Sequence, residues 1–110
     1  MPQYDLDDIK KAAINSKIEY RGTQLNRRVQ AEAQSLGFKF NDVRLTILEL
    51  TEDCFDKTHH YEKGAPDDSY IITTDCRLNE GDKVTIYLKL RLKGKHLSIV
   101  SVGSFHLPRY

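Results

Sequence analysis

The sequence predicts an α+β fold, in which an antiparallel β-sheet carries two N-terminal helices and one short helix packed on one face. Two stretches with helical spacing come first, and three strand-like stretches joined by short turns come last. Helices that are segregated from a run of strands are typical of this fold class. The length of 110 residues fits one domain, residues 1–110.

Two helices are expected at the N-terminal end. Residues 5–17 have Asp5 as the N-cap, acidic side chains in the first turn and lysines toward the end, which suits the helix dipole. Residues 23–36 have Thr23 as the N-cap and apolar side chains at helical spacing. Gly37 then suits the position after a helix, because glycine adopts positive φ without strain.

A strand and a short helix are expected next. Residues 43–50 begin with alternating apolar and polar side chains, which predicts a strand covered partly on both sides. Thr51 is the expected N-cap of a short helix, with Glu52 and Asp53 in its first turn. That helix is expected to end near residues 60–61.

Three strands joined by short turns complete the expected sheet. Residues 70–78 are rich in β-branched side chains, and the sequence Asn-Glu-Gly-Asp at residues 79–82 is a turn signal. The strand of residues 83–93 follows. After a second turn, a last strand is expected over residues 97–102 and ends at Gly103.

The strand of residues 83–93 organises this sheet, because its side chains alternate almost without a break. One face is apolar. The opposite face has no acidic residue and carries Lys83, Thr85, Tyr87, Lys89, Arg91 and Lys93. Donors spaced about 6.6 Å apart along a strand could follow the phosphates of an extended nucleic acid. The alternative is an ordinary solvated sheet face.

Charge is unevenly placed along the chain. The net charge is only +1, so attraction for a polyanion would depend on local clusters. Acidic residues crowd residues 49–68, and cations crowd residues 83–95. Arg21, Arg27 and Arg28 form a second basic cluster, for which a solvated helix face is the alternative explanation.

Several classes of protein are disfavoured by the motifs that are missing. Cys54 and Cys76 predict neither a disulfide framework nor a zinc site, and they fit a reducing, cytoplasmic location. No stretch has the length of a membrane span, and the N-terminal residues are unlike a signal peptide. Neither a phosphate-cradling glycine motif nor a nucleophile elbow occurs. On a helix the side chains of His59 and His60 would point about 100° apart, so they could not readily bind one metal ion. Neither a metal site nor a cofactor is expected.

Lys57 has two explanations. Asp53 lies four residues before it on the expected helix, so a surface ion pair would account for it. Tyr61 lies four residues after it, which places a cation and a phenol on one helical face. They would join a metal-free set of cations and hydroxyls that also includes Tyr87, Lys89 and Arg91. Such groups suit cleavage of RNA, in which the 2′-hydroxyl attacks the adjacent phosphorus while a base, an acid and cations assist.

Collinear motifs over most of the chain are similar to one bacterial family. The matching stretches are Ile9–Lys11, Ala33–Phe40, Leu50–Thr58, Ile86–Lys89 and Leu97–Ser101. Their order and spacing resemble the MqsR family of toxins, the mRNA interferases of type II toxin–antitoxin modules.

This resemblance implies a RelE-like fold of the microbial RNase type. It also implies endoribonuclease activity on mRNA at short GC-containing sites. Together with the metal-free set of cations and hydroxyls, it leads to the hypothesis of a metal-independent endoribonuclease that needs no cofactor and cleaves single-stranded mRNA. A cognate antitoxin protein would neutralise it. Neither a membrane nor DNA is an expected partner.

The resemblance also assigns roles to particular residues. The family's catalytic lysine corresponds to Lys57, and its catalytic tyrosine corresponds to Tyr87. Tyr61 matches a further family tyrosine. The residues expected to bind RNA are Tyr61, Arg77, Lys89 and Arg91.

Three departures from the family pattern bear on the mechanism. The family's catalytic glutamine is absent near the corresponding pair, Tyr70 and Ile71. His59 stands where the family often has an apolar residue, and we hypothesise that it takes over an acid or base role in catalysis. Residues 105–110 extend past the family's usual end. The alternatives are a non-catalytic module that binds RNA or a partner through the same face, and a structural domain whose basic face contacts an acidic partner.

Overall fold

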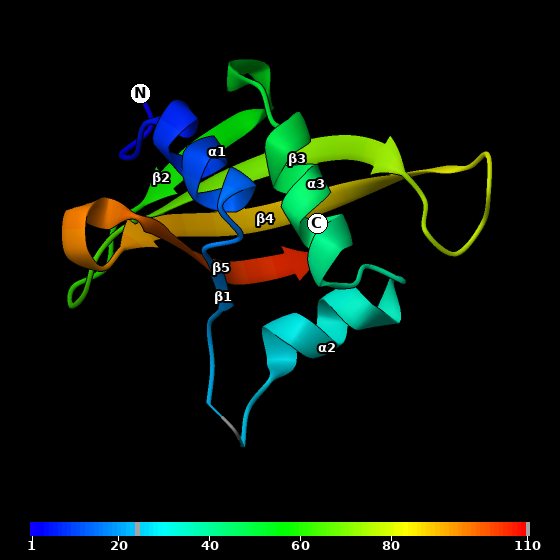
Figure 1. Ribbon diagram of the computed structural model, residues 1–110, viewed down its shortest axis with the longest axis horizontal. Helices are drawn as coiled ribbons and strands as arrows, with labels where there is room; N and C mark the ends of the chain where they lie inside the picture. The colour runs from blue at the N-terminus through cyan, green and yellow to red at the C-terminus, as the bar shows by residue number, and fades with distance from the viewer. Residues whose placement is uncertain (24, 110) are drawn as a thin grey trace.

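The computed structural model describes residues 1–23 and 25–109, which form three α-helices, five strands and two single turns of 3₁₀ helix. Figure 1 shows their arrangement. In chain order the helices and strands are α1 (Leu6–Ile14), β1 (Ile18–Tyr20), α2 (Arg28–Ser35), α3 (Phe40–Glu49), β2 (Phe55–His59), β3 (Asp67–Asp75), β4 (Lys83–Lys93) and β5 (Ile99–His106).

The five strands form one sheet in the order β1-β5-β4-β3-β2. Neighbouring strands are antiparallel except for β1 and β5, which are parallel. The predicted α+β class is therefore confirmed, but the sheet is mixed and not wholly antiparallel. The difference comes from β1, a short strand that was not expected and that adds a parallel edge beside Val100–Val102.

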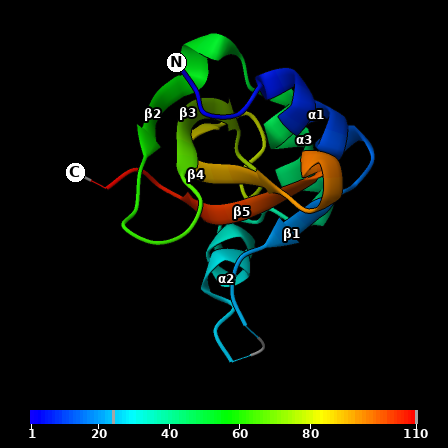
Figure 2. The same cartoon turned by 90° about the vertical axis from the view of Figure 1, so that its left-hand side faces the viewer.

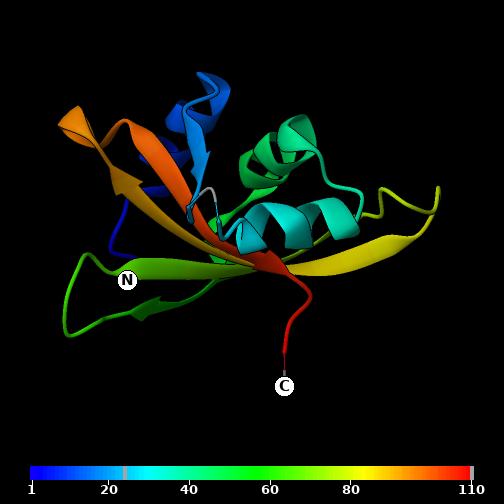
Figure 3. The ribbon, with the colours of Figure 1, turned by 90° about the horizontal axis from the view of Figure 1, so that it is seen from below.

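The helices leave one face of the sheet uncovered. Helices α1 and α3 pack together on one side of it, while the C-terminal segment leaves on the other side (Figure 3). Helix α2 instead flanks the sheet near β5 (Figure 2). The core between the helices and the sheet includes the fully buried side chains of Ile9, Phe38, Ile47, Ile86, Leu88 and Phe105.

The strand predicted over residues 43–50 is wrong, because this segment belongs to helix α3. Val43, Ile47 and Leu50 are fully buried, whereas Leu45 is 39% exposed. The buried positions follow the spacing i, i+4, i+7 of a helix face and not the alternation of a strand. Since Asp42 accepts a hydrogen bond from the backbone N–H of Lys39, the first turn of the helix is also capped.

The short helix predicted after Thr51 is also wrong in extent. Only Glu52–Cys54 form a helical turn, of the 3₁₀ type, and Phe55–His59 form strand β2. The long strand β3 would otherwise present an open row of N–H and C=O groups, and β2 pairs with these groups.

The remaining elements are close to their predicted positions. Strand β4 spans the predicted residues 83–93, with apolar side chains buried on one face. Strand β3 begins three residues earlier than expected, and β5 continues past Gly103 to His106. Helix α2 begins at Arg28, later than expected, and Gly37 follows it with φ of 83°, as predicted.

Within the described part of the chain, no helix has both the length and the apolar character needed to span a membrane.

Candidate functional site

The uncovered face of the sheet carries a row of polar side chains that crosses four strands. Lys57 pairs with Ser69, Ser69 pairs with Lys89, and Lys89 pairs with Ser104. Residues directly opposite one another in antiparallel strands point to the same face of the sheet. The row therefore brings Lys57 and Lys89, from β2 and β4, onto one surface.

A second row next to it carries two aromatic rings. Ile71 pairs with Tyr87, and Tyr87 pairs with His106. The rings of Tyr87 and His106 are stacked, with their centroids 5.3 Å apart and their planes at 21°. Strand β5 reaches this position because of a bulge opposite Lys89 and Leu90, where Gly103 is the additional residue.

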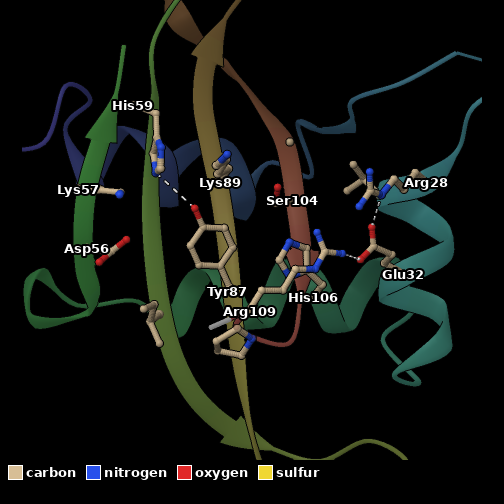
Figure 4. A pocket seen from close by; sticks show the side chains of 14 residues that line it. Arg28, Glu32, Asp56, Lys57, His59, Tyr87, Lys89, Ser104, His106 and Arg109 are labelled. Atoms are coloured by element: carbon tan, nitrogen blue, oxygen red, sulfur yellow. Dashed lines mark hydrogen bonds and ion pairs between the residues drawn. The ribbon is translucent and has the colours of Figure 1, made fainter. Parts of the chain in front are cut away.

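A β-bulge in β2 brings a carboxylate to the same surface. The register shifts between Phe55 and Lys57, so that Asp56 has no partner of its own on β3. Its side chain accepts a hydrogen bond of 2.8 Å from the hydroxyl of Ser69. Figure 4 shows Asp56 and Lys57 pointing toward the same opening.

His59 lies at the centre of this hydrogen-bonding group. Its Nε2 is 3.0 Å from the Ser69 hydroxyl and 3.3 Å from the Tyr87 hydroxyl. Burial lowers the pKa of His59 below its ordinary value of 6.5, and the positive charges of Lys89 and Lys57 lower it further. His59 is therefore mostly neutral at pH 7 and able to accept a proton.

The pKa of Tyr87 is shifted in the opposite direction. Burial raises the pKa of its phenol above the ordinary value of 10.0, although the nearby Ser69 hydroxyl partly offsets this effect. The phenol therefore keeps its proton at neutral pH. A neutral imidazole and a protonated phenol in contact are a potential proton acceptor and a potential proton donor.

These groups line a cleft of about 630 Å³. One wall is formed by β2, β3 and β4, with Lys57, His59 and Tyr87 (Figure 4). The other wall is formed by helix α2 and the C-terminal segment, which contribute Arg28, Glu32, Pro108 and Arg109. Residue 110 lies outside the described residues.

A buried ion cluster borders the cleft-lining strands. Asp67 is 1% exposed and accepts hydrogen bonds from the side chains of Arg21, Arg91 and Tyr61. Burial alone would raise the pKa of Asp67, but the hydrogen bonds from Arg91, Arg21 and Tyr61 outweigh it and hold that pKa well below 3.8. Burial and the hydrogen bond to Asp67 raise the pKa of Tyr61 to about 12.

The predicted site residues divide into three groups. Lys57, His59, Tyr87 and Lys89 line the cleft together. Tyr61 and Arg91 are joined in the Asp67 cluster beside it. The third group is Arg77, which is not among the residues that line the cleft.

Arg77 lies near the start of α3. Its guanidinium forms an ion pair with Asp42 at 2.9 Å and lies 4.8 Å from the ring centroid of Phe38. These contacts tie the β3–β4 loop to helix α3 and not to the uncovered face.

Sequence reasoning did not identify several residues of the cleft. Asp56 was missed because residues 55–59 were expected to be helical, and Ser69 was missed because the next strand was expected to begin at residue 70. His106 was missed because the last strand was expected to end at Gly103. The alternating polar positions Ser104 and His106 beyond that glycine were the signal that the strand continues.

Among residues 1–23 and 25–109, no three side chains of His, Cys, Asp or Glu come together in a way that could hold a metal ion. The charged groups that could face an anion in the cleft are lysine and arginine side chains.

Comparison with known proteins identifies the family of the chain. No curated protein matches the sequence. A family model described as "Motility quorum-sensing regulator, toxin of MqsA" matches residues 1–106. The match includes every described residue that lines the cleft except Pro108 and Arg109. The chain therefore belongs to the MqsR family, toxins of toxin–antitoxin systems, as its motifs predicted.

Proposed function

We propose that the chain is a metal-independent endoribonuclease that cleaves single-stranded mRNA at short GC-containing sites and is neutralised by a cognate antitoxin. The observation that carries this proposal is the meeting of Lys57, His59 and Tyr87 in one cleft, with Nε2 of His59 3.3 Å from the Tyr87 hydroxyl. Its place of action would be the cytoplasm, where mRNA is found.

The reaction that suits these groups is an internal transfer at phosphorus. The 2′-oxygen of one nucleotide attacks the adjacent phosphorus and loses its proton to a base. The bond from phosphorus to the 5′-oxygen of the next nucleotide then breaks, and that oxygen receives a proton from an acid. The products are a 2′,3′-cyclic phosphate and a 5′-hydroxyl. DNA is not a substrate, because it has no 2′-hydroxyl.

His59 is the base in this proposal, because its lowered pKa leaves Nε2 free to accept a proton at neutral pH. Once protonated, Nε2–H can donate to the Ser69 hydroxyl oxygen at 3.0 Å. The hydrogen of that hydroxyl is directed to Asp56, which is 2.8 Å away. Ser69 and Asp56 thus position His59 and stabilise its charged form.

Tyr87 is the acid, since burial keeps its phenol protonated beyond pH 10.0. Lys57 and Lys89 stabilise the negative charge that develops on the phosphorane oxygens. Fixed ammonium groups in a partly desolvated cleft can supply this stabilisation without a metal ion.

The other residues expected to bind RNA stay predictions. Tyr61 and Arg91 are hydrogen-bonded to Asp67, so their effect on RNA would act through that cluster. Arg77 is paired with Asp42 away from the cleft.

A non-catalytic RNA-binding module is the second candidate function. It is favoured by the absence of the family's glutamine, since Ile71 is the residue opposite Tyr87 on β3. This module would retain RNA in a salt-sensitive way and would not cut it.

Primer extension on total mRNA after brief expression tests the proposal. Wild-type protein should produce new 5′ ends at GC-containing sites, whereas Lys57→Ala and Tyr87→Phe should produce none. Lys95→Ala, which removes an exposed lysine outside the cleft, is the matched control and should cut like the wild type. Cutting by Tyr87→Phe at the wild-type rate would remove Tyr87 from the mechanism, and RNA retention without new ends would favour the non-catalytic module.

A further inference from the structure

Most of the cations expected to form a phosphate-binding ladder along β4 are paired with carboxylates of other strands. The sequence of β4 has no acid on this face, but acids from β1 and β3 reach it. Lys83 pairs with Asp75 and Lys93 pairs with Glu19, so each of these charges is offset by one carboxylate. Arg91 shares Asp67 with Arg21, but its side chain is only 21% exposed. A nucleic acid running along β4 would therefore meet few positive charges that are both unpaired and accessible.

The remaining positive charge runs across the strands and not along one of them. Lys57 of β2 and Lys89 of β4 lie in one cross-strand row, and neither forms an ion pair with another described residue. At the far wall of the same cleft lie Arg28 and Arg109. Figure 4 shows Lys57 on one side of the rings of Tyr87 and His106 and Arg28 on the other side.

Glu32 holds the two arginines of the far wall together. It accepts from Nε of Arg28 at 2.8 Å and from Nη2 of Arg109 at 3.0 Å. Two guanidinium groups share one carboxylate, so the group keeps a net positive charge. Each guanidinium also has further N–H donors, and the side chains of Arg28 and Arg109 are 65% and 61% exposed.

The two ends of the cleft are too far apart to bind one phosphate. Lys57 and Ser104 stand at the ends of the row and are separated by three strand spacings, or about 14 Å. Helix α2 lies beyond β5. An RNA strand that fills the cleft would therefore place different phosphates at the Lys57 end and at the Arg28 end.

We propose that single-stranded RNA crosses the sheet from β2 toward α2, and that Arg28 and Arg109 bind a phosphate remote from the one that is cut. The proposal rests on the proposed function only in placing the cut phosphate at Lys57. The stacked pair Tyr87 and His106 lies between the two ends, and an aromatic surface suits a nucleobase. The C-terminal segment thus serves as a wall of the substrate cleft.

An uncleavable RNA tests this path without depending on catalysis. The probe is a fluorescent octanucleotide that carries a GC-containing site with its 2′-hydroxyl replaced by 2′-O-methyl. Fluorescence anisotropy then gives the dissociation constant at several salt concentrations. The double variant Arg28→Ala/Arg109→Ala should bind about five- to tenfold more weakly, and its salt slope should fall by about 0.7 for each phosphate that the variant no longer neutralises.

The controls separate a path across the strands from a path along β4. Lys83 and Lys93 lie on the alternative path, and Lys83→Ala and Lys93→Ala should each change the dissociation constant less than twofold. Thermal unfolding of each variant checks that the fold is retained. A large loss of binding in Lys83→Ala and Lys93→Ala, or wild-type binding by the double arginine variant, would overturn the proposal, as would the absence of binding by the wild type.

Cleavage of the unmodified octanucleotide is measured in parallel. If the wild type binds as expected but does not cut, the path stands and the proposed nuclease function fails. If the wild type cuts but the double arginine variant binds like the wild type, the function stands and the path fails. The loss of affinity should also grow with RNA length, because a dinucleotide cannot reach both ends of the cleft.

Discussion

The imidazole Nε2 of His59 lies 3.3 Å from the hydroxyl of Tyr87, and the pKa values of the two groups are shifted in opposite directions. Burial disfavours the charged form of each, so the imidazole tends to be neutral and the phenol tends to keep its proton. Pairs of titratable groups whose environments move their pKa values apart are typical of acid–base catalysis.

The dependence of cleavage on pH follows from these directions. The pKa of His59 is below 6.5, so kcat/KM should rise with pH along an acid limb whose midpoint lies below 6.5. The pKa of Tyr87 is above 10.0, so the activity should fall only above that pH. His59→Gln should remove the acid limb of the profile. An acid limb with its midpoint above 6.5 would contradict the role given to His59.

Ser69→Ala should slow cleavage without unfolding the protein. The variant removes the oxygen that receives Nε2–H of His59 at 3.0 Å and breaks the link to Asp56. We expect kcat to fall about tenfold, since one hydrogen bond to a charged group is removed, while KM changes little. Ser69→Thr, which keeps a hydroxyl, should recover part of the rate. Single-turnover kinetics measure this effect, and a change confined to KM would count against a positioning role.

Asp67→Asn should destabilise the fold. The variant removes the charge that Arg21 and Arg91 share, and we expect the free energy of unfolding to fall by about 2–3 kcal/mol. This loss lies toward the low end for a buried ion pair because the arginine side chains are 33% and 21% exposed. Urea denaturation measures it. Asp75→Asn removes an ion pair whose carboxylate side chain is 73% exposed, and it should cost far less stability than Asp67→Asn.

The Asp67 carboxylate also predicts how the stability of the fold depends on pH. The pKa of Asp67 in the folded protein lies well below 3.8, its ordinary value, so the folded state binds its proton more weakly than the unfolded state. The stabilisation is therefore complete above about pH 5 and is lost as the pH falls below 3.8 toward the folded-state pKa. Denaturation at pH 7 and pH 3 should show a smaller pH effect in Asp67→Asn than in the wild type.

Gly103→Ala should displace Arg21. A Cβ at residue 103 would overlap Nη1 of Arg21, far inside van der Waals contact. Gly103 is not among the glycines with positive φ, so the backbone tolerates alanine, and the cost of about 1–3 kcal/mol should come from weakening the hydrogen bonds that hold Arg21 to Asp67. A double-mutant cycle with Arg21→Met isolates this clash. Equal costs of Gly103→Ala in both backgrounds would show that the clash with Arg21 is not the cause.

Alternation predicted the central strand well, since β4 has both ends at the predicted residues. The same signal failed for residues 43–50. Val43 and Ile47 are β-branched, but they lie on the buried face of helix α3. Tertiary packing decided between two patterns that the sequence contains together. β1 could not be foreseen, because three residues carry too little periodicity.

The candidate site was predicted in part. Lys57 and Tyr87 share one cleft, as the resemblance implied, although Lys57 lies on strand β2 and not on a helical face with Tyr61. Their contact partners depend on two bulges, at Asp56 and Gly103, and bulges change the register in ways that neighbouring strands determine. The ion pair between Arg91 and Asp67 also depends on strand pairing, so the sequence of β4 alone could not predict it.

The chemistry of the cut ends tests the central claim most directly. Purified protein is incubated in EDTA with an RNA octanucleotide that carries a cleavage site mapped by primer extension. The ends of the products are identified by mass spectrometry. We expect a 2′,3′-cyclic phosphate, or the 3′-phosphate formed from it, together with a 5′-hydroxyl. An otherwise identical RNA with 2′-deoxyribose at the site should stay intact. Cleavage of that deoxy substrate, or products that carry a 5′-phosphate and a 3′-hydroxyl, would contradict attack by the 2′-hydroxyl in the cleft of Lys57, His59 and Tyr87.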